Sequence, residues 1–173
     1  MKKEKHDEGL TKASPEQNQE KTGLTVRRMT EQDLEPLCVL LSDPDVMRFL
    51  EPPYSIEQTR AFLIRAMSDH PPVYAVDMNG HFIGYVIDHP YDEESMEAGW
   101  VLFPEHWGKG YASILTRQMI EKAGRQGKSL VIECDPTQSI TKHIALKHGF
   151  VLSERKDGLD VYILRTDLTG SCL

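Results

Sequence analysis

Hydrophobic residues follow two spacings along the chain, and each spacing predicts a different kind of element. Apolar residues that alternate with polar ones, or run on without a break, favour strands, whereas apolar residues that recur every three or four positions favour helices. The expected helices begin near Thr30, Ser55, Ser113 and Gln138. Together the elements predict a mixed α/β fold. The expected strands cover residues 24–28, 73–78, 81–87, 95–103, 130–132, 150–153 and 159–164.

Two of the helix starts carry capping signals. Thr30 and Asp33 supply a cap and a first-turn acid, and Ser55 with Gln58 forms a capping box. In each case side-chain oxygens can accept hydrogen bonds from the N–H groups that a starting helix leaves unpaired. Pro71-Pro72 is expected to end the helix that Ser55 begins.

Turn residues predict how neighbouring strands pair. Asn79-Gly80 and Asp157-Gly158 are typical of tight hairpin turns, so the strands on either side of each turn are expected to be antiparallel. The strand at 95–103, the helix at 113–126 and the strand at 130–132 form a strand-helix-strand unit. Such a unit joins parallel neighbours by a right-handed crossover. The unbroken apolar run at 130–132 indicates burial on both faces of the sheet.

The composition is that of an ordinary globular chain with an excess of acidic residues. Its 173 residues suffice for one domain, and 27 Asp and Glu against 20 Lys and Arg give a net charge of −7. That charge argues against a general nucleic-acid binder, because it repels phosphates. It suits a cationic substrate, although a modest negative charge can equally serve solubility alone.

The cysteines and the hydropathy of the chain predict a cytoplasmic protein. Cys38, Cys134 and Cys172 are scattered and cannot all pair, so we expect no disulfide and a reducing compartment. The seven histidines lack metal-ligand spacing, and we expect no metal. No apolar run reaches the length of a membrane span, and Met1-Lys2-Lys3-Glu4-Lys5 leads into polar residues, so we expect no membrane association.

The ends of the chain differ in composition from its middle. Residues 1–23 are almost wholly polar or charged and cannot bury enough surface to offset the entropy of ordering, so we expect a flexible tail. Residues 24–168 are expected to form the single domain, and residues 169–173 a short C-terminal tail. A homodimer is left open.

A glycine loop lies between the strand at 95–103 and the helix at 113–126. In Trp107-Gly108-Lys109-Gly110-Tyr111-Ala112, two glycines let the backbone approach a ligand closely, and the N–H groups of the starting helix favour an anion. Lys109 adds a positive charge. The pattern is therefore typical of a phosphate site, and the plainer alternative is a tight strand-to-helix connection.

Four segments together resemble one family. The segment 104–112, which ends in Ala112, resembles the acyl-CoA pyrophosphate loop of GNAT N-acetyltransferases. The segment 138–150, which ends in Gly149-Phe150, resembles the Asn-x-x-Ser helix of the same family. Residues 24–33 and 41–48 resemble the branch that includes ribosomal-protein N-terminal (alanine) acetyltransferases. The resemblance covers the chain from about Leu24 to Arg165.

This resemblance implies a fold and a cofactor. It implies a mostly antiparallel sheet with helices on both faces, in which the parallel strands at 95–103 and 130–132 splay apart around the acyl-CoA cleft. The implied cofactor is acetyl-CoA. The residues that the resemblance places against it are Val101, Leu102, Phe103, Trp107, Gly108, Lys109, Gly110, Tyr111, Ala112, Gln138 and Thr141.

The chain departs from the family pattern at four positions, and three of them are among the residues just listed. Trp107 stands where Gln or Arg is usual, Gln138 where Asn is usual, and Thr141 where Ser is usual. Gln138 and Thr141 keep hydrogen-bonding groups. Ala145 stands where many relatives place a tyrosine that protonates the leaving thiolate, so that acid is absent.

Two residues are candidates for the acid–base chemistry of acetyl transfer. Glu97 matches a carboxylate that this branch often has near the start of the strand, where it can take the ammonium proton directly or through a water. The alternative is an exposed glutamate without a chemical role. Thr141 has a hydroxyl that can replace the missing tyrosine, or it can simply cap its helix. Trp100, Phe49, Tyr54 and Tyr91 are candidates to line an acceptor pocket or to belong to the core, and Glu51, Asp92, Glu93 and Glu94 can make its entrance acidic.

The leading function is therefore an acetyl-CoA-dependent N-acetyltransferase that acts on a primary amine. A protein or peptide N-terminus is the first choice of acceptor, because the front-end resemblance belongs to that branch. A small cationic amine, such as a polyamine or an aminoglycoside, is the alternative. A CoA-binding sensor with little turnover is a second class, and a Gly-x-Gly nucleotide binder is a third that Pro104-Glu105-His106 argues against.

Overall fold

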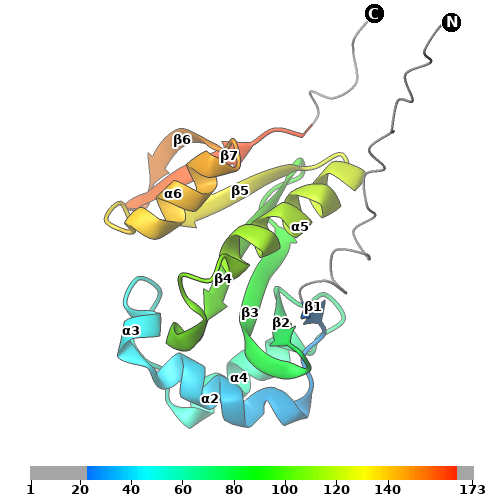
Figure 1. The fold of residues 1–173 in the computed structure, drawn as a ribbon, viewed down its shortest axis with the longest axis vertical. Helices are drawn as coiled ribbons and strands as arrows, with labels where there is room; N and C mark the ends of the chain where they lie inside the picture. Colours follow the sequence, from blue (N-terminus) through cyan, green and yellow to red (C-terminus); the bar gives the residue numbers. More distant parts are fainter. Residues whose placement is uncertain (1–22, 167–173) are drawn as a thin grey trace, which may run out of the picture.

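The computed structural model describes residues 23–166. The tails expected at 1–23 and 169–173 lie outside the described residues, apart from Gly23. One seven-stranded sheet runs through the described part, in the strand order β1-β2-β3-β4-β5-β7-β6. Helices lie on both of its faces (Figure 1).

The elements follow the predicted order, with small differences at their ends. β3 continues to Pro90, beyond the expected end at 87, and α3 is a short helix that the sequence pattern did not indicate. The strands are β1 (Leu24–Arg27), β2 (Val73–Met78), β3 (His81–Pro90), β4 (Ser95–Leu102), β5 (Ser129–Cys134), β6 (Val151–Lys156) and β7 (Leu159–Leu164). The helices are η1 (Glu31–Asp33), α2 (Leu34–Ser42), α3 (Pro44–Met47), α4 (Ile56–Ala66), η2 (Pro104–His106), α5 (Tyr111–Arg125) and α6 (Ser139–Lys147).

The predicted turns and the predicted crossover are confirmed. Asn79 and Gly80 both take positive φ angles, of 50° and 79°, between the antiparallel strands β2 and β3. Asp157 and Gly158 do the same between β6 and β7, with φ angles of 50° and 86°. β4 and β5 are parallel neighbours joined through α5.

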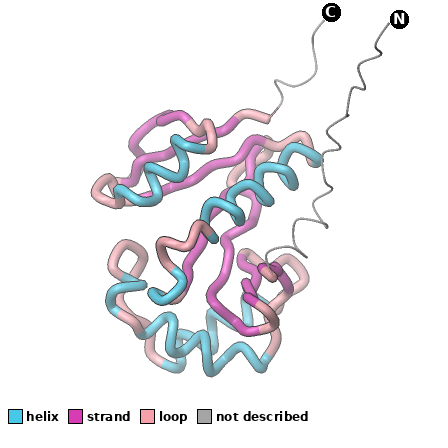
Figure 2. The backbone as a smooth tube through the Cα atoms, viewed as in Figure 1, coloured by secondary structure: helices cyan, strands magenta, loops and turns pink. Residues whose placement is uncertain are grey.

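β4 and β5 pair over only part of their length. Their register runs from Ser95 opposite Ser129 to Glu97 opposite Val131, and within the described residues the ladder ends there. Both strands continue past this point, β4 to Leu102 and β5 to Cys134. Beyond the last pair they diverge, as the green and yellow strands do in Figure 1 and the two magenta tubes do in Figure 2.

Two hydrophobic cores lie on opposite faces of the sheet. The first contains Leu115 and Met119 of α5, Ala145 of α6, and the strand residues Ala98 and Ile132. Each large apolar side chain that is buried there contributes about 1.5–3 kcal/mol relative to an exposed one. The apolar side chains of α5 therefore face the sheet.

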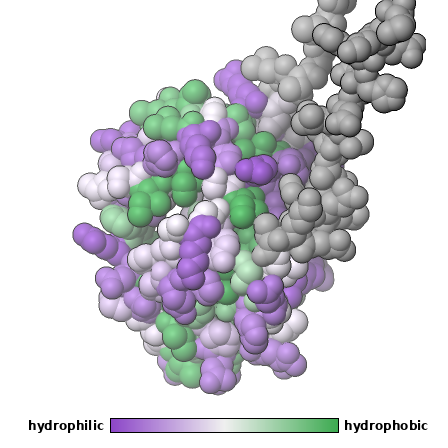
Figure 3. Space-filling view, in the orientation of Figure 1, coloured by the Kyte–Doolittle hydropathy of each residue, from purple (hydrophilic) through white to green (hydrophobic). Residues whose placement is uncertain are grey.

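The second core binds α2 and α4 to the other face. It contains Leu37 and Leu41 of α2, Leu63 of α4, and Tyr85 and Val101 of the sheet. On the face of the molecule that Figure 3 shows, hydrophobic residues form separate patches between hydrophilic ones. In the residues that the structure describes, no helix is both long enough and apolar enough to cross a bilayer.

A partly buried ion network fixes the start of α2. Arg27 of β1 donates to both oxygens of Asp33 at 2.8 Å and to Asp77 of β2 at 2.7 and 3.0 Å. The Thr30 N–H also donates to Asp33, at 2.8 Å. The expected cap and first-turn acid are present in the single turn η1, which begins after Thr30 and precedes the α-helix, and Asp33 also pairs with Arg27. The capping box of Ser55 and Gln58 is present as expected.

Candidate active site

The divergence of β4 from β5 leaves the end of β4 with one open edge. Along a strand, successive N–H and C=O pairs point to opposite neighbours, so half of those between Ala98 and Leu102 face away from β3. These groups can hydrogen-bond a ligand that enters between the two strands. The side chains of Val101 and Leu102 are buried, so only the backbone groups of these residues are available to a ligand.

Gly84 allows β3 to press closely against this end of β4. Gly84 has a φ angle of 151°, and a Cβ built on it would lie 2.0 Å from the Val101 carbonyl oxygen and 2.8 Å from Leu102 Cα. No larger residue fits without displacing that backbone. The position of Val101 and Leu102 therefore depends on a glycine in the neighbouring strand.

The glycine loop presents an open, positively polarised surface at the start of α5. Gly108 and Gly110 have φ angles of 68° and 82°, and Gly110 is the N-cap of the helix. A Cβ on either glycine would meet no described atom within 4 Å. The first residues of α5, from Tyr111 to Ser113, are uncharged, and Lys109 is exposed. These features fit an anion such as a pyrophosphate.

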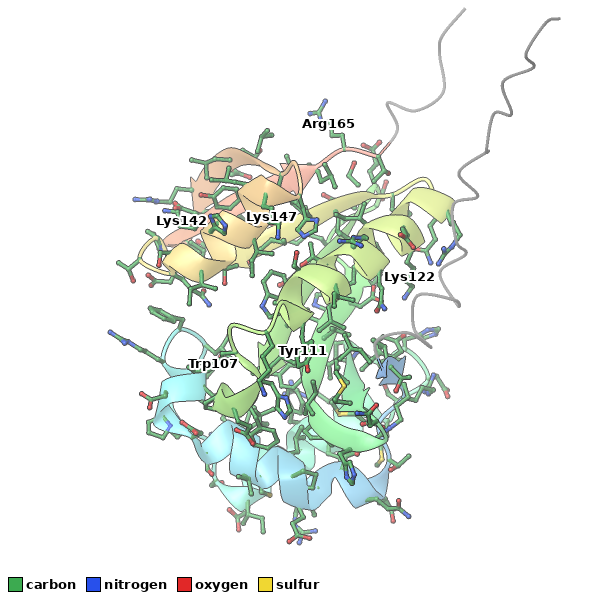
Figure 4. All side chains as sticks on the ribbon, viewed as in Figure 1. Trp107, Tyr111, Lys122, Lys142, Lys147 and Arg165 are labelled. Carbon is green, nitrogen blue, oxygen red and sulfur yellow. The ribbon has the colours of Figure 1, made fainter. Side chains whose placement is uncertain are left out.

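Trp107 attaches this loop to the end of β4. Its indole Nε1–H donates to the Leu102 carbonyl oxygen at 2.8 Å. The indole has no other polar group, so this hydrogen bond to the strand uses all of its hydrogen-bonding capacity. Figure 4 shows Trp107 and Tyr111 on the two sides of the loop, where β4 ends and α5 begins.

The start of α6 brings the second sequence motif to the end of β5. Gln138 is the N-cap residue, and Thr141 is the third residue of the helix. The alternative in which Thr141 caps its own helix is therefore not what the structure contains. Ala145, at the position where the family resemblance led us to look for a tyrosine, is fully buried in the first core.

Glu97 lies on the other face of the sheet, beside a cavity of about 250 Å³. Its side chain is 23% exposed, and its Oε2 lies 3.3 Å from Nε2 of His89. Burial raises the pKa of Glu97, the charge of His89 lowers it, and the charge of Glu133 raises it, so that the pKa lies above its ordinary value. The cavity is lined by Phe62, Arg65, Pro72, Val73, Tyr85, Ile87, His89 and Glu97.

Glu133 is a second carboxylate near Glu97, and the sequence patterns did not single it out. It lies on β5 two residues after Val131, which pairs with Glu97. Residues two apart along a strand lie on the same face of the sheet, so Glu133 and Glu97 share one face. The Tyr91 hydroxyl donates to Glu133 Oε1 at 2.7 Å. The hydrogen bond to Glu133 and partial burial raise the pKa of Tyr91 to about 12.

The aromatic and acidic residues that we considered for an acceptor pocket lie in different places, and among them Tyr91 is hydrogen-bonded to Glu133 on the face of Glu97. Trp100 packs against the core on the α5 face, and Tyr54 contacts Phe62 edge-on at 6.4 Å. Glu51 lines a separate cavity of about 350 Å³ beside α3. Asp92 accepts hydrogen bonds from the N–H groups of Glu94 and Ser95 and so closes a turn.

His89 lies beyond the expected end of its strand at 87, but β3 continues to Pro90, so His89 belongs to the strand and Glu97 of β4 is directly opposite. A strand that is exposed toward its end loses the apolar alternation on which the prediction depended. Within residues 23–166, the acidic, cysteine and histidine side chains form no group of three or more that could hold a metal ion.

Comparison with known proteins places this geometry in a family context. Residues 23–151 match the family model described as the acetyltransferase (GNAT) domain. A curated relative from Bacillus subtilis (strain 168), the uncharacterised N-acetyltransferase YnaD, is 24% identical over 132 residues, which are 73% of this chain and 78% of that protein.

Two solved structures with named acceptors have the same fold. The ribosomal L7/L12 α-N-protein acetyltransferase RimL, in complex with coenzyme A, superposes with a TM-score of 0.70 at 18% identity, over 84% of this chain and 96% of that chain. The spermidine N-acetyltransferase of Vibrio cholerae, in complex with CoA and spermine, superposes with a TM-score of 0.68 at 22% identity, over 82% of this chain and 93% of that chain.

Proposed function

The chain belongs to the GNAT family of acetyltransferases, which take their acetyl group from acetyl-CoA, and we propose that it acetylates the α-amine of a protein or peptide N-terminus. The observation that carries the proposal is the position of Glu97. A half-buried carboxylate borders a cavity at the point where β4 and β5 separate, on the face opposite the glycine loop. The donor and the acceptor can therefore meet from opposite sides of the sheet.

The donor side fits acetyl-CoA. The N–H groups at Gly108 and Gly110 and the charge of Lys109 would hold the pyrophosphate, because the space before them is open and α5 starts there. The backbone N–H groups near Val101 and Leu102 would hold the thioester oxygen. When bound, the thioester supplies an activated acetyl carbonyl.

Glu97 acts as the general base in this proposal. An amine attacks only in its neutral form, so the ammonium must first lose a proton, and a carboxylate beside the cavity can accept it. The raised pKa of Glu97 makes it a better proton acceptor than an ordinary surface glutamate. An α-amine, with an ordinary pKa of about 7.7–8.0, needs less help than a lysine amine at about 10.4.

Thr141 is the proposed hydrogen-bond donor to the departing sulfur. Ala145 has no polar group, whereas the hydroxyl of Thr141 lies in the first turn of α6, at the end of β5. A hydroxyl in that place can donate to a thiolate as negative charge develops on it.

A small cationic amine is the second candidate for the acceptor, and Glu133 favours it. Glu97 and Glu133 place two carboxylates on one face of neighbouring strands, and two negative charges attract an acceptor that carries more than one ammonium group. The fold neighbour from Vibrio cholerae acts on spermidine.

Incubation of the purified protein with acetyl-CoA and three separate panels, of peptides, polyamines and aminoglycosides, tests the proposal by mass spectrometry. We expect a gain of one acetyl group on peptides with a free N-terminus. Matched peptides that are blocked at the N-terminus but carry a lysine serve as the control. Acetylation of polyamines or aminoglycosides alone would replace the proposed acceptor, and tight acetyl-CoA binding without any transfer would favour a sensor.

A further inference from the structure

We propose that His89 is a positioning residue that accepts the acceptor's proton from Glu97 and releases it to solvent. The inference rests on the proposed function, in which Glu97 is the base. It adds a residue that the family resemblance did not indicate, and it follows from the hydrogen-bond geometry of both nitrogens of one imidazole ring.

The first nitrogen fixes which tautomer of His89 is present. Nδ1 lies 2.9 Å from the Pro90 carbonyl oxygen. A carbonyl oxygen can only accept a hydrogen bond, so Nδ1 must carry the hydrogen. In a neutral imidazole only one nitrogen is protonated. Nε2 of neutral His89 therefore has a free lone pair.

The second nitrogen faces the base. Nε2 of His89 lies 3.3 Å from Oε2 of Glu97. With Nε2 unprotonated and Glu97 ionised, two acceptors would face each other, and the contact becomes favourable when a proton lies between them. The pair is thus arranged to take up one proton.

The sheet holds the two side chains in this relation. His89 and Glu97 are direct partners in the antiparallel ladder of β3 and β4, which keeps their Cβ atoms on one face and about 4.5–5.5 Å apart. The ladder continues through Pro90 opposite Met96, so the carbonyl that fixes the tautomer belongs to the same rigid hairpin.

The exposure of the two side chains and the charges around them favour transfer of the proton from Glu97 toward solvent. The side chain of His89 is 34% exposed and that of Glu97 is 23% exposed, so the histidine is nearer to solvent. Arg65 of α4 lines the same cavity, and Glu133 of β5 with Tyr91 of the β3–β4 loop lie on the other side of Glu97. The charge of Glu133 favours retention of the proton on Glu97, so Glu97 needs an outlet before the next turnover.

The proton balance of one turnover is then complete. The ammonium gives one proton to Glu97, which passes it to Nε2 of His89, and water receives it. The neutral amine forms a bond to the acetyl carbon, and the bond from that carbon to sulfur breaks. The nitrogen loses a second proton, which ends on the departing sulfur. One proton is thus released to solvent for each amide formed.

Kinetics of His89→Ala and His89→Gln, with His81→Gln as the matched control, test the inference. His81 is an exposed histidine on the same strand. At low buffer concentration near neutral pH we expect kcat for both His89 variants to fall about tenfold, with unchanged acetyl-CoA affinity. This is less than the roughly 10²–10⁴-fold loss of a direct acid–base group, because water can still accept the proton from Glu97. Added imidazole should restore the His89→Ala rate, because a dissolved base can accept the proton. His81→Gln should match the wild-type protein.

A loss of rate that does not respond to imidazole would show that His89 has a structural role, and it would overturn the relay. An unchanged kcat in both His89 variants, together with an impaired Glu97→Gln variant, would also overturn the relay. If Glu97→Gln instead keeps wild-type turnover, the proposed base is wrong, and the relay falls with it.

An NMR measurement needs no acceptor. Nitrogen-15 chemical shifts of the His89 ring should show the Nδ1–H tautomer when the ring is neutral. Detection of the Nε2–H tautomer would overturn the proposal whatever the acceptor proves to be.

Discussion

The two sides of the sheet carry the two halves of the candidate site, and they are built differently. On the α5 face, the proposed anion site consists of consecutive residues, Trp107 to Ala112, and would act through backbone N–H groups. On the α4 face, the proposed acid–base group is assembled from β3, β4 and β5, which contribute His89, Glu97 and Glu133. The first is a local structure, and the second exists only after the sheet has formed.

This difference has a physical origin. A helix start binds anions through groups that every residue has, so it needs glycine mainly to give conformation and access. Proton transfer depends on a pKa, and a pKa depends on burial and on neighbouring charges. Those neighbours come from any part of the chain that the fold brings close.

The largest expected effect is on acetyl-CoA binding, which the account assigns to the α5 face. Gly110→Glu should weaken acetyl-CoA binding by at least about 100-fold, because a carboxylate would occupy the space where an anion binds. Calorimetric titration measures it. The matched control is Gly127→Glu, at another glycine with positive φ and open surroundings, after α5.

Both variants add strain of about 1–2 kcal/mol, because L side chains disfavour positive φ. Only Gly110→Glu should lose the cofactor. Equal weakening in both variants would show that the effect comes from lost stability, and unchanged affinity in Gly110→Glu would remove the loop from the site.

The next effect should appear only on the acceptor side. Glu97→Gln should lower kcat near neutral pH by about 10²-fold or more, the usual range for a general base, while acetyl-CoA affinity stays the same. Wild-type activity should fall as the pH drops through the raised pKa of Glu97, because the protonated acid cannot accept a proton.

The Glu97→Gln rate should recover in part at alkaline pH, where more of the amine is neutral. Glu94→Gln, in the exposed β3–β4 loop, is the control and should behave as wild type. Full turnover of Glu97→Gln across the pH range would contradict the assignment of the base.

A substitution on the α2 face should lower the stability of the protein without changing acetyl-CoA binding on the α5 face. Asp33→Ala should lower the free energy of unfolding by about 2 kcal/mol. This is less than the roughly 3–5 kcal/mol for a fully buried pair, because Arg27 is partly exposed and keeps Asp77 as a partner. Urea unfolding measures it, with the exposed Glu31→Ala as control. Acetyl-CoA affinity should be retained, since α2 packs on the other face.

The same network predicts a dependence on pH. Burial raises the pKa of Asp33, but the hydrogen bonds from Arg27 and Thr30 outweigh this and leave the pKa below its usual value. The folded state therefore gains stability above the ordinary aspartate pKa of about 3.9 and loses it as the pH falls through the lowered value. Asp33→Ala should lack this part of the acid dependence, and an unchanged acid profile would show that Asp33 contributes nothing.

The smallest effect concerns the hydroxyl at the start of α6. Thr141→Ala should lower kcat by a few-fold, roughly 1 kcal/mol, which is the size of one neutral hydrogen bond. Thr141→Ser should restore the rate, because it keeps the hydroxyl. If Ser is as slow as Ala, the methyl group matters instead, and the proposed contact with sulfur is wrong.

The two halves of the site also differ in how far the sequence could predict them. The glycine loop, the turns at Asn79-Gly80 and Asp157-Gly158, and the β4-α5-β5 crossover follow from local patterns, and the fold contains all of them. The role of Trp107 as a tether to Leu102 did not follow, because its partner belongs to the preceding strand.

Most of the acceptor side was also out of reach of the sequence. Family resemblance indicated Glu97, but Glu133 and His89 carry no motif, and they meet Glu97 only through strand register. Trp100, which the sequence left between the pocket and the core, belongs to the core, on the face of β4 opposite Glu97. Register was the missing information, because one residue of shift moves a side chain to the other face.

Backbone amide NMR during titration with acetyl-CoA tests most directly whether the donor occupies the α5 face and the gap between β4 and β5. The largest shift changes should fall on Gly108 and Gly110 of the loop and on Val101 and Leu102 of β4, while the amides of α2 stay in place. Changes concentrated on α2 and α4, with the loop amides unmoved in a saturated sample, would contradict the account.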